Sequence, residues 1–124
     1  MSKNKITLNT AEEWTTKWRG EGRDFLAKNK LNAFLIPAED LMEVLKELKV
    51  EKGQKYVRAY LGLTEDNTAK LAIVGTEEAT DAKGNTYYKD LLPKKEDGIG
   101  VEGEGIYDLT SPCPPDCDPT SPLV

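Results

Sequence analysis

The strongest constraint on the fold is a segment in which side chains alternate between two faces. Residues 56–63 read Tyr-Val-Arg-Ala-Tyr-Leu-Gly-Leu, which places the apolar positions 57, 59, 61 and 63 on one face of a strand. The opposite face carries Tyr56, Arg58 and Tyr60. A polar turn follows at residues 65–68, and residues 70–75 form a second apolar run. The pattern predicts an antiparallel β-hairpin.

A first helix is predicted over residues 11–19. Thr10 begins a Thr-x-x-Glu capping box, in which the hydroxyl accepts a hydrogen bond from a free backbone N–H. The apolar stripe of this helix would consist of Ala11, Trp14 and Trp18, and we read it as a core face rather than a ligand platform. Gly20 and Gly22 should end the helix, because glycine costs about 1 kcal/mol in a helix interior. A short helical turn is expected over residues 24–30.

A strand and a second helix should follow. Residues 33–36 are an apolar run stopped by Pro37, which indicates a buried strand. Proline suits the first turn of a helix, where no N–H partner is needed, so Pro37 should open a helix that ends before Gly53. The apolar residues of this helix recur at helical spacing: Leu41, Val44, Leu45 and Leu48.

The order of these elements predicts the fold class. Residues 81–85 give a second turn signal, and residues 105–109 indicate a last strand. We expect an α+β fold with a small, mainly antiparallel sheet of three to five strands, packed by two or three helices. Residues 1–110 would form a single domain, and residues 111–124 an extended C-terminal tail rich in proline and cysteine.

Composition restricts the possible functions. The chain of 124 residues has no histidine, which removes Ser-His and Cys-His nucleophile pairs and the usual zinc-ligand sets. We therefore assign no catalytic residue, no metal ligand and no cofactor, and expect a protein that is not an enzyme. No apolar run is long enough to span a bilayer, and the N-terminus lacks a signal-peptide core, so we expect a cytoplasmic protein without a membrane partner.

The net charge of −5 is unevenly distributed. Residues 1–60 carry 12 basic and 9 acidic side chains, whereas residues 61–124 carry 5 basic and 13 acidic ones. Nucleic acid is not an expected partner, because phosphate binding needs clustered cations. A cationic partner for the acidic half stays open, although the composition favours an acidic surface that is simply solvated.

The last fifteen residues hold five of the seven prolines and both cysteines. Cys113 and Cys117 are separated by Pro-Pro-Asp. The pattern favours packed, chemically silent thiols, while three alternatives stay open. A disulfide would clip the tail, although a reducing cytoplasm argues against a permanent bridge. A metal site would need further ligands, and redox catalysis is disfavoured by the surrounding prolines and carboxylates.

Residues 98–103 contain a glycine motif that resembles a nucleotide-binding pattern. Gly98, Gly100 and Gly103 match the spacing G-x-G-x-x-G inside an acidic stretch over residues 96–104. A dinucleotide site requires a helix after the motif to hold the pyrophosphate, and none is expected here. A flexible loop is the better interpretation.

Tyr56, Arg58 and Tyr60 form a candidate interaction face. If helices cover only the face that carries Val57 and Leu61, these three side chains are exposed. Tyrosine and arginine are enriched at protein interfaces. The alternative is ordinary packing across strands, with Tyr87 and Tyr88 as further aromatic neighbours.

Three stretches resemble a group of small uncharacterised bacterial proteins with a Cys-Pro-Pro-x-Cys tail. They are residues 33–41 (AFLIPAEDL), 57–62 (VRAYLG) and 111–117 (SPCPPDC). The resemblance implies the same layout of helix, strand, helix and hairpin, but no site residue.

For the function, we expect a non-enzymatic protein-interaction or assembly module that binds a protein partner or itself. The alternative is a thiol-dependent binder or redox protein that uses Cys113 and Cys117.

Overall fold

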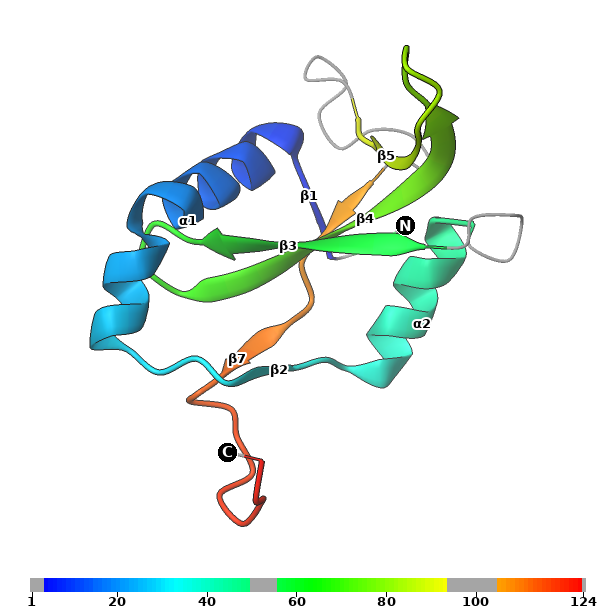
Figure 1. Ribbon diagram of the computed structural model, residues 1–124. Coiled ribbons are helices and arrows are strands. Elements are labelled where there is room, and N and C mark those ends of the chain that lie inside the picture. The colour runs from blue at the N-terminus through cyan, green and yellow to red at the C-terminus, as the bar shows by residue number, and fades with distance from the viewer. Residues whose placement is uncertain (1–3, 50–55, 94–104, 124) are drawn as a thin grey trace.

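The computed structural model describes residues 4–49, 56–93 and 105–123 (Figure 1). It has two helices, a mainly antiparallel five-stranded sheet and a small two-stranded sheet, which confirms the predicted α+β class. The elements are β1 (Lys5–Ile6), α1 (Leu8–Lys28), β2 (Ala33–Leu35), α2 (Ala38–Glu47), β3 (Val57–Leu63), β4 (Ala69–Thr80), β5 (Thr86–Leu91), β6 (Ile106–Tyr107) and β7 (Ser111–Cys113).

The long strand β4 organises the main sheet. The strand order is β1-β6-β4-β3, and β5 also pairs with β4. The hairpin of β3 and β4 is confirmed, in a register that joins Val57 to Gly75 and Leu63 to Ala69. β4 extends past the predicted run to Thr80, because its second half pairs with β5. β3 therefore ends the order of the described strands.

Helix α1 differs from the prediction at its start and along its length. Thr7, not Thr10, is the N-cap, and its Oγ1 accepts a hydrogen bond from the Thr10 N–H at 3.1 Å. The helix also continues through both glycines to Lys28. Gly22 is buried, and a Cβ at this position would lie 3.0 Å from the Trp18 ring. Packing of Trp18 over the bare backbone at Gly22 therefore offsets a propensity cost of about 1 kcal/mol for that glycine.

Helix α2 matches its predicted pattern. Pro37 is its N-cap, and Glu39 and Asp40 lie in the first turn, where the helix dipole favours acidic side chains. Val44 and Leu48 are completely buried. They form one core cluster with Ile73, Tyr107 and Leu109.

The two helices cover opposite faces of the sheet. α1 contributes Ala11 to a second core cluster, with Ala72, Val74 and Ile106. Ala72 and Val74 flank Ile73 on β4, so they point to the face opposite the one that α2 covers. In Figure 1 α1 lies beside one end of the β3–β4 hairpin and α2 beside the other.

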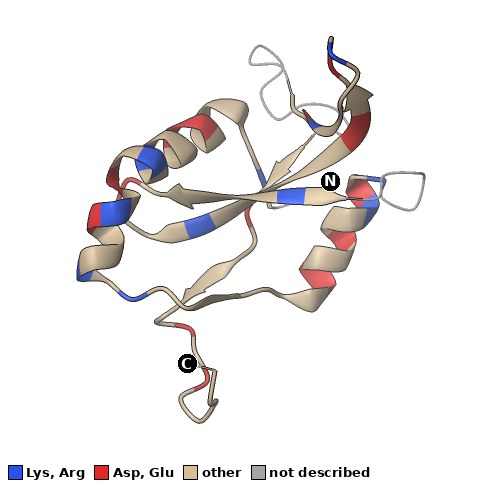
Figure 2. Cartoon of the chain, viewed as in Figure 1, with Lys and Arg blue, Asp and Glu red and all other residues tan. Residues whose placement is uncertain are grey.

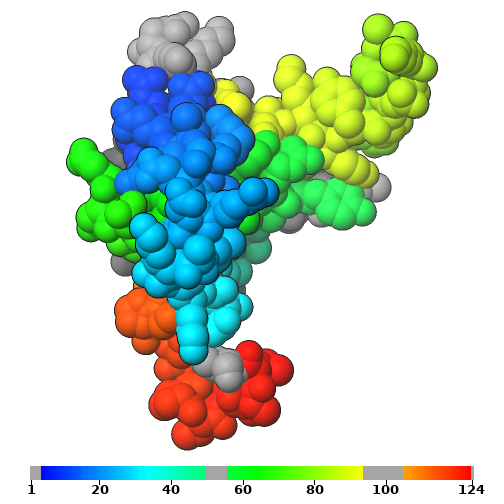
Figure 3. Space-filling view, turned by 60° about the vertical axis from the view of Figure 1, so that its left-hand side comes forward, coloured from blue at the N-terminus to red at the C-terminus, as the bar shows by residue number. Residues whose placement is uncertain are grey.

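The tail begins inside the fold. β2 pairs with β7, so the first three residues of the predicted tail form a strand. The strand predicted at residues 33–36 is present but is not buried, since Leu35 is 55% exposed. All three residues of β2 pair with β7, and Ala33 and Leu35 lie together on the exposed face of this small sheet. Beyond β7, the C-terminal segment projects from the body of the molecule (Figures 1 and 3).

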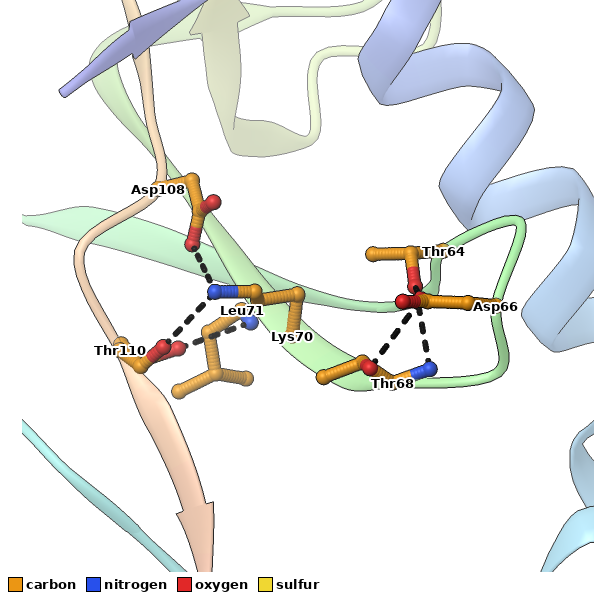
Figure 4. A network of polar contacts seen from close by, with 7 residues as sticks. All are labelled: Thr64, Asp66, Thr68, Lys70, Leu71, Asp108 and Thr110. Carbon is orange, nitrogen blue, oxygen red and sulfur yellow. Dashed lines mark hydrogen bonds and ion pairs between the residues drawn. The ribbon is translucent and has the colours of Figure 1, made fainter.

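Polar contacts tie the segment between β6 and β7 to β4 (Figure 4). Lys70 Nζ donates to the Thr110 carbonyl at 3.1 Å and lies 3.3 Å from Asp108 Oδ1. The Leu71 N–H donates to Thr110 Oγ1 at 3.3 Å. Burial raises the pKa of Asp108, partly offset by Lys70. The same view shows Thr64, Asp66 and Thr68 bonded to one another in the β3–β4 turn.

Candidate functional site

The structure brings Arg58 and Tyr60 together on Asp90, a residue of β5. The Arg58 guanidinium donates to one carboxylate oxygen of Asp90, and the Tyr60 hydroxyl donates to the other. Arg58 also donates to the Tyr88 carbonyl at 3.0 Å. One carboxylate thus fixes two side chains that lie about thirty residues away in the sequence.

These contacts set the charge of the cluster. The hydrogen bond from Arg58 to Asp90 raises the pKa of Arg58, because it favours the charged guanidinium. The hydrogen bond to Asp90 also raises the pKa of Tyr60 above its usual 10.0, because ionised Tyr60 could no longer donate. Tyr60 is therefore a neutral donor and Arg58 a cation at neutral pH.

The third predicted residue, Tyr56, joins this surface through its ring. Tyr56 and Tyr88 meet edge to face, with centroids 4.7 Å apart and an interplanar angle of 63°. Tyr56 is 56% exposed and Tyr60 is 38% exposed. We call the surface formed by five residues the tyrosine–arginine surface: Tyr56, Arg58, Tyr60, Tyr88 and Asp90.

The sequence predicted that the face of β3 with Tyr60 is exposed if helices cover only the opposite face. The structure does not meet this condition. A Cβ at Gly62 would lie 2.8 Å from Trp14 Cβ, so α1 lies on the face of β3 that carries Tyr60. The tyrosine–arginine surface stays partly exposed, and α1 lies beside the end of β3 at which the hairpin turns. The opposite face is open as well, since Val57 is 39% exposed and Leu61 40%.

Arg58 is the only charged residue of β3 (Figure 2). In the same view, acidic residues recur along α2, whose last turn carries the basic Lys46, and α1 carries both signs along its length. A cavity of about 140 Å³ lies between the first half of α1 and the sheet, and Tyr60 and Asp90 form part of its lining. The tyrosine–arginine surface thus borders a small apolar hollow.

Cys113 and Cys117 lie as a close pair, joined by a disulfide in the structure, with Cα atoms 4.8 Å apart. Cys113 is 3% exposed in β7, and its carbonyl accepts a hydrogen bond from the Asn32 N–H at 2.7 Å. Cys117 is half-buried.

Pro114 and Pro115 line a groove of about 310 Å³ against the end of α1, near Phe25 and Asn29. Across residues 4–49, 56–93 and 105–123, no three His, Cys, Asp or Glu side chains are grouped for a metal ion.

The glycine motif and the acidic stretch over residues 96–104 lie outside the described residues. Trp14 and Trp18 are half-buried, Trp14 against Gly62 and Trp18 against Gly22 and Phe25. None of the described helices is long and apolar enough to cross a membrane.

Sequence reasoning missed Asp90 and did not assign Tyr88 to the site. The available signal was their spacing of two after the turn at residues 81–85, which places both on one face of a strand. Comparison of the chain with protein-family models, curated proteins and solved structures finds no match. The resemblance to small bacterial proteins therefore stays a prediction from its residues.

Proposed function

We propose that the protein is a non-enzymatic protein-interaction or assembly module, with the tyrosine–arginine surface on β3 as its recognition surface. The observation that carries the proposal is the double contact of Asp90 with Arg58 and Tyr60, on a face that remains partly exposed. Binding costs less entropy when side chains are already fixed in the free protein. Tyrosine and arginine are also enriched among the residues that dominate binding energy at interfaces.

The backbone supports the same proposal. β3 ends the order of the described strands, so its outer edge offers N–H and C=O groups to an extended partner. Recognition by strand addition takes affinity from these backbone groups and specificity from the side chains on both faces. On β3 those faces are the tyrosine–arginine surface and the apolar positions Val57 and Leu61.

Partner capture by the immobilised full chain tests the proposal. Arg58→Ala and Tyr60→Ala should each reduce capture of a specific partner about tenfold or more, as expected for dominant interface residues. Arg23→Ala and Tyr87→Ala change the same residue types at exposed positions elsewhere and should leave capture unchanged. Equal capture by all four variants would rule out the tyrosine–arginine surface as the recognition surface.

A truncation separates this surface from the tail. Deleting residues 111–124 would remove β7 from the fold, so the informative deletion is 118–124. Under the proposal, capture survives this deletion. If truncation abolishes capture and Arg58→Ala does not, recognition belongs to the projecting segment, where proline restricts the backbone.

The alternative function is thiol-dependent, and the half-buried Cys117 of the close pair favours it. Cytosolic disulfides are usually transient or redox-sensing. In such a step the two thiols give two electrons and two protons to a small-molecule disulfide, which is reduced to two thiols. Intact mass with and without reductant, together with a zinc assay on the untagged chain, checks this alternative. A chain with neither the two-proton mass difference nor bound zinc would exclude it.

A further inference from the structure

We propose that the partner of β3 is a second copy of this chain, paired antiparallel with β3 about a two-fold axis that passes between the two copies of Ala59. The inference rests on the proposed function, because it names the partner of the same strand. The two copies would form one continuous sheet.

The edge of β3 lacks the features that usually prevent strand pairing. Natural edge strands are protected by proline, lysine, bulges or shortness. β3 is seven residues long, without proline or lysine, and residues 57–61 are all exposed. Its single charge, Arg58, is already paired with Asp90. Among the described strands, only β4 pairs with β3.

Symmetry limits the possible registers. When a two-fold axis perpendicular to the sheet relates two antiparallel strands, one residue of β3 lies opposite its own copy, and the axis passes midway between the two copies. The position of the axis is named below by that residue. An axis at Arg58 would place two like charges directly opposite, which is unfavourable. An axis at Tyr60 would set Arg58 opposite Gly62, and Val57 opposite the buried Leu63.

An axis at Ala59 makes every pair complementary. Val57 of each copy lies opposite Leu61 of the other, which removes two exposed apolar side chains from water on each chain. On the other face, Arg58 lies opposite Tyr60 of the second copy. Because Tyr60 holds Asp90 of its own chain, each guanidinium faces an aromatic ring and a carboxylate.

The ends of the paired strands fit the same register. Tyr56, which is 56% exposed, lies opposite Gly62 of the second copy, and Trp14 of that copy covers this glycine. The register therefore brings an exposed tyrosine ring beside a half-buried tryptophan. Aromatic pairs of this kind are favoured at interfaces.

The test is sedimentation equilibrium of the full chain over a range of concentrations. Wild-type protein should dimerise. Ala59→Glu and Ala59→Lys should each weaken the dimer about tenfold or more, since residue 59 faces itself and each variant juxtaposes like charges. An equimolar mixture of the two variants should restore dimers as a mixed species. Ala82→Glu, at an exposed position in the β4–β5 turn, is the matched control and should dimerise normally.

The outcomes separate this inference from the proposed function. Ala59 is exposed, so both variants should keep the wild-type circular dichroism spectrum. A wild-type chain that stays monomeric up to about millimolar concentration overturns the inference, because even weak specific association is detectable there. A dimer that tolerates Ala59→Glu overturns it too. In either case, partner capture lost in Arg58→Ala would still support the proposed function.

Discussion

Asp90 decides how the side chains of β3 are presented. Without it, Arg58 and Tyr60 would be two mobile side chains on an edge strand. With it, the guanidinium and the hydroxyl are held by opposite oxygens of one carboxylate. The sequence showed Arg58 and Tyr60 as alternating residues of a strand. It did not show that a residue of β5 joins them.

Replacing Asp90 by alanine should lower the pKa of Tyr60 towards 10.0, because the acceptor of its hydroxyl is lost. Since this pKa is raised on folding, the Tyr60–Asp90 bond stabilises the fold below pH 10.0 and is lost as the pH rises through the folded value. An NMR titration of tyrosine ring carbons measures the shift. Asp66→Ala, a carboxylate in the β3–β4 turn, is the control. An unchanged Tyr60 titration in Asp90→Ala would contradict the assigned contact.

Among the helices and strands, strong periodicity was a reliable guide. The β3–β4 hairpin and α2 follow from side-chain spacing alone. Only α2 buries the side that its pattern marks, because Val57 and Leu61 of β3 stay exposed. The break predicted at Gly20 and Gly22 is wrong, because local propensity cannot show that Trp18 packs over Gly22. The pairing of β2 with β7 joins residues about eighty positions apart, and no local pattern reports such a contact.

The contact between α1 and β3 predicts opposite effects for two glycines. Gly20→Ala has open space around the new Cβ and should stabilise the fold by about 0.5–1 kcal/mol. Gly62→Ala would place its Cβ 2.8 Å from Trp14 Cβ, and should destabilise the fold by about 1–3 kcal/mol through overpacking. Urea unfolding of both variants gives the comparison. A neutral Gly62→Ala would mean that α1 does not press on β3 at this point.

The tie between β4 and the segment before β7 predicts a pH dependence. The pKa of Asp108 is raised by burial, so its contribution to stability is present below pH 3.8 and is lost as the pH rises through the folded value. The unfolding free energy of Asp108→Asn relative to wild type should therefore increase between about pH 3 and pH 7. Hydrogen bonds from Thr64 and Thr68 lower the pKa of Asp66, so Asp66→Asn should show the opposite trend. Parallel trends in urea unfolding would contradict this assignment.

For the molecule as a whole, the boundary between a domain over residues 1–110 and a tail over residues 111–124 remains a prediction. The free energy of unfolding can show how much the end of the chain contributes to stability. Deleting residues 118–124 should change the unfolding free energy by less than about 0.5 kcal/mol, as for other exposed changes. Reducing the Cys113–Cys117 disulfide should lower the free energy of unfolding by roughly 2 kcal/mol, which is the loop-closure contribution expected for a very short loop. A truncation as costly as reduction would place the projecting segment inside the cooperative fold.

Hydrogen exchange across β3 gives the sharpest check on recognition by this strand. With the partner bound, whether a second copy at high concentration or a captured protein, amides in residues 57–61 should exchange several-fold more slowly than in the free monomer. Amides in residues 118–123 should be unchanged. Protection of the tail with none in β3 would contradict the account.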